Sequence, residues 1–301
     1  CPVPVLRIGT QDTFGKSGTV PALLEEYGLT PENVAEKAQE LLNLFYDNWI
    51  TEWDLDNIKS MGFNCVRVPF WYRNFQSDNN GTWILDENGE IDLSRLEWAV
   101  EMCRKYGLYA ILDLHAANGV QGYADHAGHV NNYHFFDQDE KGEWYRAQAV
   151  ELWRVIAERF AGDPAIAMFD LINEPIAPYF ENVPELNAKL EPLHKRVTAA
   201  IREVDPNHII MIGAPQWNSN FDPFTDWTYD DNMMYSCHRY GGDASIAAIG
   251  NFIAFRDKTN LPMYMGEIGH NTDEWQEAFC IAMEQSNIGY TFWPYKKIRN
   301  S

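Results

Sequence analysis

Two glutamates stand at the ends of predicted strands, where a pair of carboxyl groups could do acid–base or nucleophilic chemistry. One closes the run Ile172-Asn173-Glu174-Pro175, and the other lies in Met265-Gly266-Glu267-Ile268-Gly269. If the strands are parallel, both side chains lie at the same edge of the sheet. One carboxyl group can then hold a proton while the other is ionised. A single glutamate at a strand end is most often a solvated rim residue, but two followed so closely by Pro or Gly favour a functional site.

The composition is that of an acidic globular protein. Hydrophobic residues make up 46% and charged residues 22% of the 301 positions, which suffices for a sizeable core. The 44 acidic and 23 basic side chains leave a net charge of −21, which repels phosphate backbones and anionic membranes. We therefore expect no nucleic-acid partner and no membrane partner, and no apolar run approaches the roughly 18 residues of a membrane span. The 11 tryptophans would suit the flat faces of sugars.

The cysteines and the N-terminus add two expectations. The cysteines are odd in number and lack C-x-x-C spacing, so free thiols are expected rather than disulfides or a zinc site; they are Cys1, Cys65, Cys103, Cys237 and Cys280. No basic region followed by an apolar run opens the chain, so we expect no signal peptide in it.

Short apolar runs alternate with amphipathic segments from residue 63 onward, which is typical of strand–helix units around a parallel sheet. The predicted strands span residues 63–69, 108–115, 166–172, 208–213, 232–238, 261–266 and 288–293. The predicted helices span residues 144–160, 190–204, 244–256 and 273–285, and another begins at Ser94, where Glu97 completes a capping box. Seven such units are one short of a (β/α)8 barrel, and the length suits a single barrel.

The first 42 residues have a different character. Residues 3–8 are a possible strand, and Thr30 and Pro31 begin a helix that runs to about Leu42. The stretch from VPVLRIG through DTFG and LLEEYGLT resembles the C-terminal tail of transketolase-type thiamine enzymes. This resemblance implies two parts, a borrowed tail over residues 1–42 and a catalytic barrel over 43–301. The tail carries none of the family's thiamine-binding residues, so no thiamine cofactor is expected.

The chain from residue 63 to residue 301 resembles glycoside hydrolase family 5, which includes many cellulases. The resemblance rests on eight positions at predicted strand ends: Arg67 in VRVP, His115 in DLH, Asn173 and Glu174 in INEP, His238 and Tyr240 in CHRY, Glu267 in GE and Trp293 in FW. It implies a TIM barrel that uses neither a metal ion nor another cofactor. The implied activity is that of a retaining endo-β-glycanase acting on β-1,4-glucans by a two-carboxylate double displacement.

The resemblance also implies a role for each residue. Glu174 is the acid/base and Glu267 the nucleophile, and Arg67 keeps the nucleophile ionised. The remaining residues support catalysis or bind the substrate: Tyr240 donates to the nucleophile, His238 orients the acid/base side, Asn173 bonds the sugar 2-hydroxyl, Trp293 lies under the sugar, and His115 completes the set. Taken singly, most of these residues also have an ordinary structural interpretation.

Two loops are expected to border the site. Residues 116–142 form a segment too long for an ordinary strand–helix connection, and we expect it to wall the cleft. Its histidines His126, His129 and His134 favour polar lining over a metal site because their spacing is irregular. The loop after Gly213 carries three aromatic residues that could bind a glucan chain, Trp217, Phe221 and Trp227, although Trp227 could equally belong to the core.

The barrel is expected to be incomplete, because the family's own first strand and last helix are not found. Open strand edges favour pairing with another chain, so we predict a homodimer, formed by exchange of N-terminal elements. Three alternatives to a β-1,4-glucanase stay open: a β-1,3-glucanase or a mannanase of the same family, and a carbohydrate-binding protein without activity. The family resemblance favours an extracellular location.

Overall fold

A computed structural model describes residues 5–10, 15–127, 133–269 and 271–297. The chain divides into two compact units, one of residues 1–62 with 297–301 and one of residues 63–296. The predicted boundary at residues 42 and 43 falls inside a continuous helix, α2 (Pro31–Trp49). Among the described residues, none of the helices combines the length and the apolar character needed to cross a bilayer.

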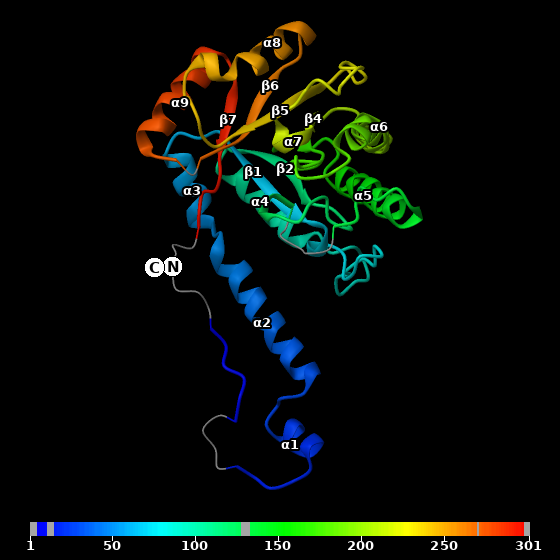
Figure 1. The fold of residues 1–301 in the computed structure, drawn as a ribbon. Helices are drawn as coiled ribbons and strands as arrows, with labels where there is room; N and C mark the ends of the chain where they lie inside the picture. The colour runs from blue at the N-terminus through cyan, green and yellow to red at the C-terminus, as the bar shows by residue number, and fades with distance from the viewer. Residues whose placement is uncertain (1–4, 11–14, 128–132, 270, 298–301) are drawn as a thin grey trace. The chain divides into compact units, whose positions relative to one another are not determined.

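The larger unit is a sheet of seven parallel strands whose order in space follows the chain. The strands are β1 (Cys65–Trp71), β2 (Tyr109–Ala116), β3 (Ile166–Asp170), β4 (Ile209–Gly213), β5 (Met233–Arg239), β6 (Met263–Ile268) and β7 (Gly289–Phe292). The two end strands approach each other, since the rings of Phe63 and Phe292 lie 5.9 Å apart. The sheet is therefore a nearly closed barrel, which confirms the predicted TIM-barrel class and its seven strands (Figure 1).

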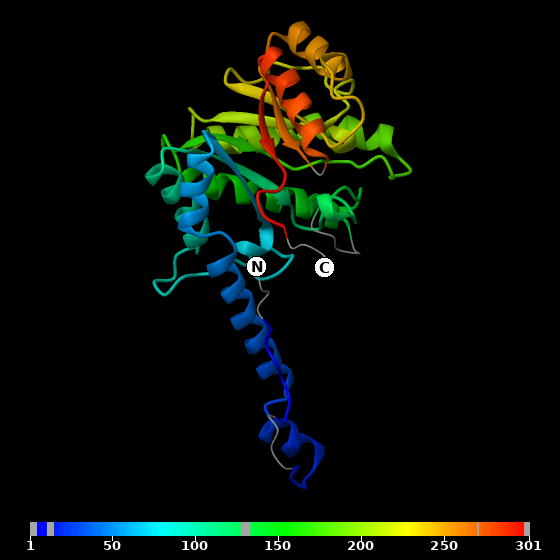
Figure 2. The same cartoon turned by 90° about the vertical axis from the view of Figure 1, so that its left-hand side faces the viewer.

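Helices surround the strands of this unit, as the alternating pattern predicts (Figures 1 and 2). They are α4 (Ser94–Lys105), α5 (Glu140–Arg159), α6 (Val183–Arg202), α8 (Gly250–Thr259) and α9 (Asp273–Gln285), with a short α7 (Pro215–Asn218) and three 3-10 turns, η1 (Tyr72–Asn74), η2 (Asp125–Ala127) and η3 (Ile246–Ile249). No helix follows β7 within the described residues, which end at Lys297.

The barrel interior is filled by side chains that point inward from successive strands. Ile111, Met168, Met211, Met234 and Tyr264 form one buried cluster. Residues on the opposite side of the strands, such as Leu112 and Phe169, are also fully buried, because helices cover the outer face of a parallel sheet. This double burial explains why the strands are continuous apolar runs.

The pairing register shifts near the carboxyl ends of three strands. The shifts lie between Phe70 and Trp71 in β1, between Cys237 and His238 in β5, and between Met265 and Ile268 in β6. An extra residue at such a point re-aims the side chains beyond it. The shifts in β5 and β6 therefore occur where these strands present His238 and Glu267.

Two local predictions about helix starts need correction. Ser94 does not cap its helix: the N-cap is Leu93, and the Asp92 carboxylate accepts from the Ser94 amide at 3.0 Å. Helix α6 begins at Val183 rather than Leu190, because Pro184 in its first turn is compatible with a helix start.

The smaller unit contains α1 (Val20–Glu26), α2 and α3 (Glu52–Ser60). Thr30 caps α2 as predicted, accepting from the Asn33 amide at 3.3 Å, but the helix continues past Leu42 to Trp49. The possible strand at residues 3–8 is wrong for residues 5–8, which form no strand and expose Val5 by 81%. Residues 3 and 4 lie outside the described residues.

Candidate active site

The carboxyl ends of the parallel strands bring all eight residues of the expected set to one end of the barrel. Arg67 lies on β1, His115 on β2, His238 on β5 and Glu267 on β6, while Asn173 and Glu174 follow β3, Tyr240 follows β5 and Trp293 follows β7. Hydrogen bonds and ring contacts join these side chains to one another.

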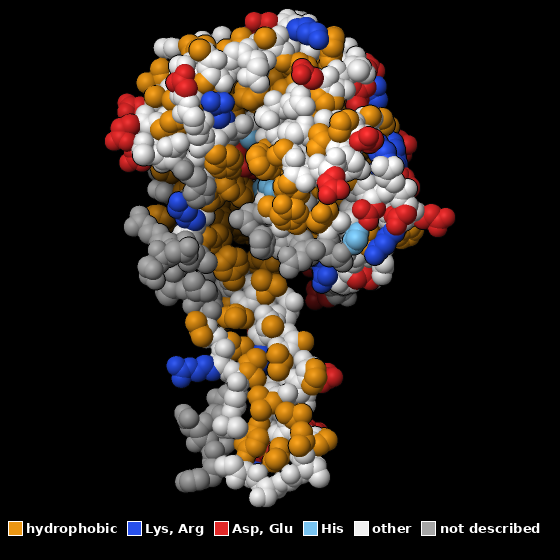
Figure 3. Space-filling model, viewed as in Figure 1, with side chains coloured by type: hydrophobic (Ala, Val, Ile, Leu, Met, Phe, Trp, Pro, Cys, Tyr) orange, Lys and Arg blue, Asp and Glu red, His pale blue; other side chains and the backbone are white. Residues whose placement is uncertain are grey.

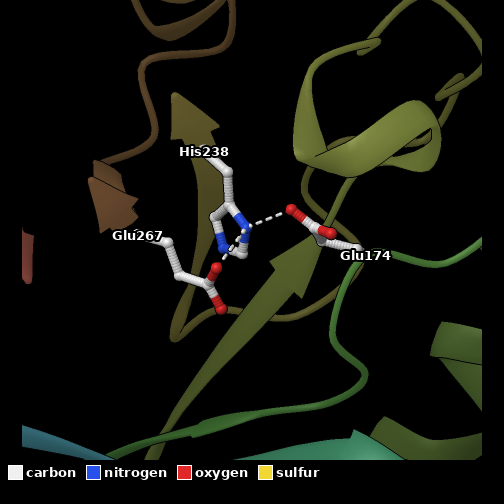
Figure 4. Close-up of side chains that lie close together, drawn as sticks. All are labelled: Glu174, His238 and Glu267. Atoms are coloured by element: carbon white, nitrogen blue, oxygen red, sulfur yellow. Dashed lines mark hydrogen bonds and ion pairs between the residues drawn. The ribbon is translucent and has the colours of Figure 1, made fainter. Parts of the chain in front are cut away.

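Glu174, His238 and Glu267 form the centre of this cluster (Figure 4). Nδ1 of His238 lies 2.9 Å from Oε1 of Glu174 and 3.6 Å from Oε2 of Glu267. One carboxylate oxygen of Glu174 lies within 4.8 Å of one of Glu267. Both carboxyl groups are buried, with residue exposures of 6% and 3%, so each is sensitive to the charges around it.

Arg67 contacts Oε1 of Glu267, whereas His238 lies nearer to Oε2. Nη1 of Arg67 donates to Oε1 of Glu267 at 2.6 Å, and its Nη2 donates to Oδ1 of Asn173 at 2.9 Å. Burial alone would lower the pKa of Arg67, but the carboxylates of Asp113, Asp170 and Glu267 raise it. The guanidinium is therefore a permanent cation with a fixed direction.

The electrostatics favour an ionised Glu267. Burial acts to raise its pKa, but His238 and the charge of Arg67 outweigh burial and lower the pKa to about 2. The Tyr240 hydroxyl also donates to Oε2. Burial and the charge of Glu267 raise the pKa of Tyr240, so this hydroxyl keeps its proton. Glu267 is therefore a carboxylate throughout the neutral range.

Two buried aspartates beneath Arg67 were missed at the sequence level. Oδ2 of Asp170 accepts from Nε of Arg67 at 2.9 Å, and Oδ1 of Asp113 lies 3.0 Å from Nη2. Both residues have no exposed surface. Burial raises the pKa of Asp170 to about 6, against the opposing charge of Arg67. The available signal was an aspartate inside an otherwise apolar predicted strand.

His115 links these aspartates to Trp293. Its Nδ1 lies 2.8 Å from Oδ2 of Asp113, and its ring stacks on Trp293 with 4.8 Å between centroids and 5° between planes. The Asn173 amide lies 3.4 Å from Nε2 of His115 and donates to the carbonyl of His126 at 2.8 Å. Asn173 is thus oriented from three sides, counting Arg67.

The residue before Glu267 must be glycine. A Cβ at Gly266 would lie 2.5 Å from Oγ of Ser236 and 2.8 Å from Nε2 of His238. Glu174 itself has a positive φ of 39°, a backbone conformation that carries strain for a residue with a side chain and that is frequent at functional sites. Both carboxylates are thus presented by unusual backbone.

The long loop lies against the site as expected. The Gln121 amide donates to the carbonyls of His115 at 2.8 Å and of Asn173 at 3.0 Å. His134 pairs with Asp137 at 2.5 Å, and neither His126 nor His134 belongs to a cluster of metal-binding side chains in the part of the chain that the structure describes. His129 lies outside the described residues.

The three aromatic residues after Gly213 have different surroundings. Trp217 is 46% exposed, which leaves its ring accessible. Phe221 is buried, and its ring lies 4.7 Å from that of Phe255, so it belongs to the core and the expected sugar contact is wrong. Trp227 is partly buried, with Lys258 over its ring at 4.2 Å.

The spacing of Glu174, His238 and Glu267 would also admit a metal ion. Arg67 already neutralises Glu267 at 2.6 Å, and a second cation at that carboxylate would be repelled. We assign no metal here. The space-filling view shows hydrophobic side chains around a hollowed part of the barrel unit, with histidine and acidic surface inside it (Figure 3).

A barrel of parallel strands that holds an ionised carboxylate close to a second carboxyl group at its mouth has the machinery for cleaving glycosidic bonds. The protein is a glycoside hydrolase. Residues 30–297 match the family model described as Cellulase (glycosyl hydrolase family 5), and the chain belongs to that family. The match begins inside residues 2–42, whose resemblance to a transketolase tail stays a prediction.

Individual relatives agree with this assignment. The chain is 30% identical over 212 residues to a beta-xylosidase of Phanerodontia chrysosporium, covering 68% of this chain and 40% of that protein. It is 25% identical over 315 residues to endoglucanase C of Acetivibrio thermocellus, covering 84% and 86%. Among solved structures, Cel5A of Thermotoga maritima in complex with mannotriose has a TM-score of 0.62 at 18% identity, covering 81% of this chain and 82% of that one; this likeness concerns the fold.

Proposed function

We propose that the protein is a retaining endo-β-glycanase that hydrolyses β-1,4-glucans of the cellulose or mixed-linkage type. The observation that carries the retaining mechanism is the approach of the two carboxyl groups, oxygen to oxygen, within 4.8 Å. Retaining glycosidases hold their carboxyl groups about 5 to 5.5 Å apart, whereas inverting enzymes leave about 6.5 to 9.5 Å for a water molecule. The relationship to endoglucanase C supports the substrate class.

The first step uses the difference between the two carboxyl groups. Glu174 donates its proton to the leaving glycosidic oxygen while an ionised oxygen of Glu267 attacks the anomeric carbon, which gives a covalent glycosyl–enzyme ester. Arg67 and Tyr240 direct the attacking carboxylate through their hydrogen bonds to its two oxygens. The leaving chain departs as an alcohol.

The second step reverses these roles. The carboxylate of Glu174 removes a proton from water, the water oxygen attacks the anomeric carbon, and the ester bond to Glu267 breaks. Asn173 is the proposed donor to the sugar 2-hydroxyl. Trp293, held flat by its stacking on His115, is the proposed platform under the sugar at the cleavage point.

Two measurements test this proposal. Reducing-sugar release is measured on carboxymethylcellulose, barley β-glucan, laminarin, glucomannan and xylan, with Glu267→Gln as the control in every assay. We expect release from the first two substrates and a loss of at least about a thousandfold in the variant. Proton NMR of the first product formed should show the β-anomer before mutarotation.

Each other outcome points to a named alternative. Release from laminarin alone would make the enzyme a β-1,3-glucanase, and release from glucomannan alone a mannanase. An α-anomer as first product would overturn the retaining mechanism. Binding of these polysaccharides by a folded protein without any release would identify a carbohydrate-binding protein that has lost catalysis.

Association into a homodimer by exchange of N-terminal elements belongs to the same proposal. It is supported by the free edges of β1 and β7, which have no hydrogen-bonded neighbour beyond β2 and β6 among the described strands, because such edges favour pairing with another chain. Size-exclusion chromatography with light scattering at micromolar concentration should give twice the mass of one chain, and a monomer would overturn this part.

A further inference from the structure

Asn218, the last residue of α7, lies next to the Nε2 side of the His238 ring. It has no exposed surface. Its Nδ2 is 3.1 Å from Nε2 of His238 and 3.3 Å from Oγ of Ser236. His238 is therefore held at both ring nitrogens, by Asn218 on one side and by Glu174 on the other, where Nδ1 lies 2.9 Å from Oε1.

The backbone that delivers this amide is strained. Gln216, Trp217 and Asn218 have φ values of 52°, 59° and 51°, a left-handed run that is unfavourable for residues with a side chain. Gln216 fixes the run, because its main-chain and side-chain nitrogens both donate to the carbonyl of Ile176, at 2.8 Å and 3.0 Å. A strained backbone segment that neighbouring groups hold in place is frequent at functional sites.

Two glycines leave room for the contact. A Cβ at Gly213 would lie 3.0 Å from Oδ1 of Asn218, and a Cβ at Gly266 would lie 2.8 Å from Nε2 of His238. The amide and the imidazole thus meet where the neighbouring strands carry no side chain.

The donor in this contact decides the protonation of the ring. An amide N–H can donate only to a ring nitrogen that carries no proton, so donation by Asn218 requires an Nε2 without a proton and the single ring proton on Nδ1. That proton faces Oε1 of Glu174. A neutral ring leaves Glu174 able to keep its own proton, whereas an imidazolium at this distance would favour the Glu174 carboxylate.

The charged groups around His238 favour the protonated ring instead. Burial lowers the pKa of His238, but the facing carboxylates of Glu267 and Glu174 raise it and outweigh burial, while Arg67 opposes them. The more distant Asp170 also interacts electrostatically with the ring. Within this set, the neutral amide of Asn218 is the group placed to keep a second proton off Nε2.

We propose that Asn218 is a positioning residue that holds His238 in its neutral, Nδ1-protonated form, so that Glu174 retains the proton it donates to the leaving group. This inference rests on the proposed function, in which Glu174 is the general acid.

The variant Asn218→Asp replaces the donor by an acceptor of the same shape, and aspartate tolerates the left-handed backbone. An aspartate would favour an imidazolium at His238. The matched control is Asn220→Asp, which adds the same charge in the same loop, where the amide contacts Gln216 instead of His238. Thermal unfolding of both variants reports whether each folds.

The first readout is the 15N NMR spectrum of histidine-labelled protein between pH 5 and 8, with the His238 signals assigned by their absence in His238→Gln. We expect an unprotonated Nε2 and a protonated Nδ1 in the wild type and in Asn220→Asp. Asn218→Asp should raise the pKa of His238 by about one unit or more. A wild-type ring that is protonated at Nε2 at pH 7 would overturn the proposal, whether or not the variant folds.

The second readout is the pH profile of kcat/KM on barley β-glucan. An imidazolium beside Glu174 favours its carboxylate over the protonated acid, so the alkaline limb in Asn218→Asp should move down by about one pH unit, with about a tenfold loss above it. An unchanged limb together with an unchanged His238 titration would overturn the proposal. If the wild type cleaves no glycan, the proposed function fails, while the NMR titration still decides the role of Asn218.

Discussion

Nη1 of Arg67 lies 2.6 Å from Oε1 of Glu267, although 200 positions separate the two residues in the chain. They stand on β1 and β6, which are not neighbours in the sheet. The contact therefore exists only because the sheet curves into a nearly closed barrel and directs both side chains inward. The charge state of the proposed nucleophile depends on this curvature.

Two substitutions at Arg67 should distinguish the contribution of its charge from that of its forked shape. Arg67→Lys keeps a cation but loses the fork that reaches Glu267, Asp170 and Asn173 together, so we expect kcat to fall about a hundredfold or more. Arg67→Met leaves buried carboxylates without their cation and should lower the free energy of unfolding by about 3–5 kcal/mol.

Enzyme assays and urea unfolding measure these two effects. Arg154→Lys is the matched control, because Arg154 pairs with Glu151 and Glu158 on the outside of α5, and such pairs contribute little. Wild-type kcat in Arg67→Lys would contradict the role given to the fork.

The free energy of unfolding should be greatest at a mildly acidic pH. Asp170 has a pKa raised to about 6 by burial, so its unfavourable ionisation is relieved as the pH falls below about 6. Glu267 has the opposite sign, because its pKa of about 2 lies below the unfolded value of 4.5; its contribution is present above pH 4.5 and is lost towards pH 2.

Urea unfolding at a series of pH values checks this balance. The free energy of unfolding should rise from pH 7 to about pH 5 and fall below about pH 4. Asp170→Asn should remove part of the rise, and Glu267→Gln should reduce the fall. If the free energy of unfolding of Asp170→Asn rises as much as that of the wild type, groups other than Asp170 cause the rise.

Trp217 should bind substrate without taking part in the chemistry. The residue is 46% exposed and lies on α7, which follows β4. We expect Trp217→Ala to raise KM for β-glucan about tenfold, the loss of about 1.4 kcal/mol of ring contact, with kcat on a short aryl glycoside nearly unchanged.

Trp98→Ala is the matched control, since Trp98 is 40% exposed but lies on α4. It should leave both constants at their wild-type values. An unchanged KM in Trp217→Ala would remove this residue from the proposed binding surface.

Gly266→Ala should harm activity more than stability. The added methyl group would displace His238 and Ser236, which lie 2.8 Å and 2.5 Å from it, and a misplaced group at a catalytic site can cost about a hundredfold in rate. Gly250→Ala is the control, because a Cβ there meets nothing within 4 Å. Kinetics and thermal unfolding of the two variants should diverge, and equal kcat values would contradict this account.

The sequence was sufficient for the fold because the apolar runs of a parallel barrel are long and regular. The eight residues of the expected set came from the resemblance to glycoside hydrolase family 5; the structure places them together at one end of the barrel, and their roles stay predictions. Helix α4 begins at Ser94 as predicted, but the capping role was wrongly given to Ser94, since the Asp92 carboxylate two residues earlier accepts from the Ser94 amide. Local capping patterns do not show which of two side chains makes the bond.

Asp113, Asp170 and Asn218 could not be identified by the same reasoning. The aspartates gain their role from Arg67 on another strand, and only the barrel brings the three together. Asn218 gains its role from a left-handed run in which Gln216 and Trp217 carry ordinary side chains, so no glycine or proline signals the turn. Phe221 was misassigned because exposure depends on neighbours far along the chain.

The register shifts in β5 and β6 fall immediately below His238 and Glu267. The extra residue is Gly266 of β6, because Cys237 pairs with Met265 and His238 pairs with Glu267. The side chains of β6 therefore follow a different phase after this residue than before it. This point is therefore a natural junction for chimeric enzymes. Replacing these strands and their loops from residues 237 and 265 onward would transfer a related enzyme's substrate preference to this barrel. A junction placed after the register shift would instead put the transplanted side chains on the wrong face of the sheet.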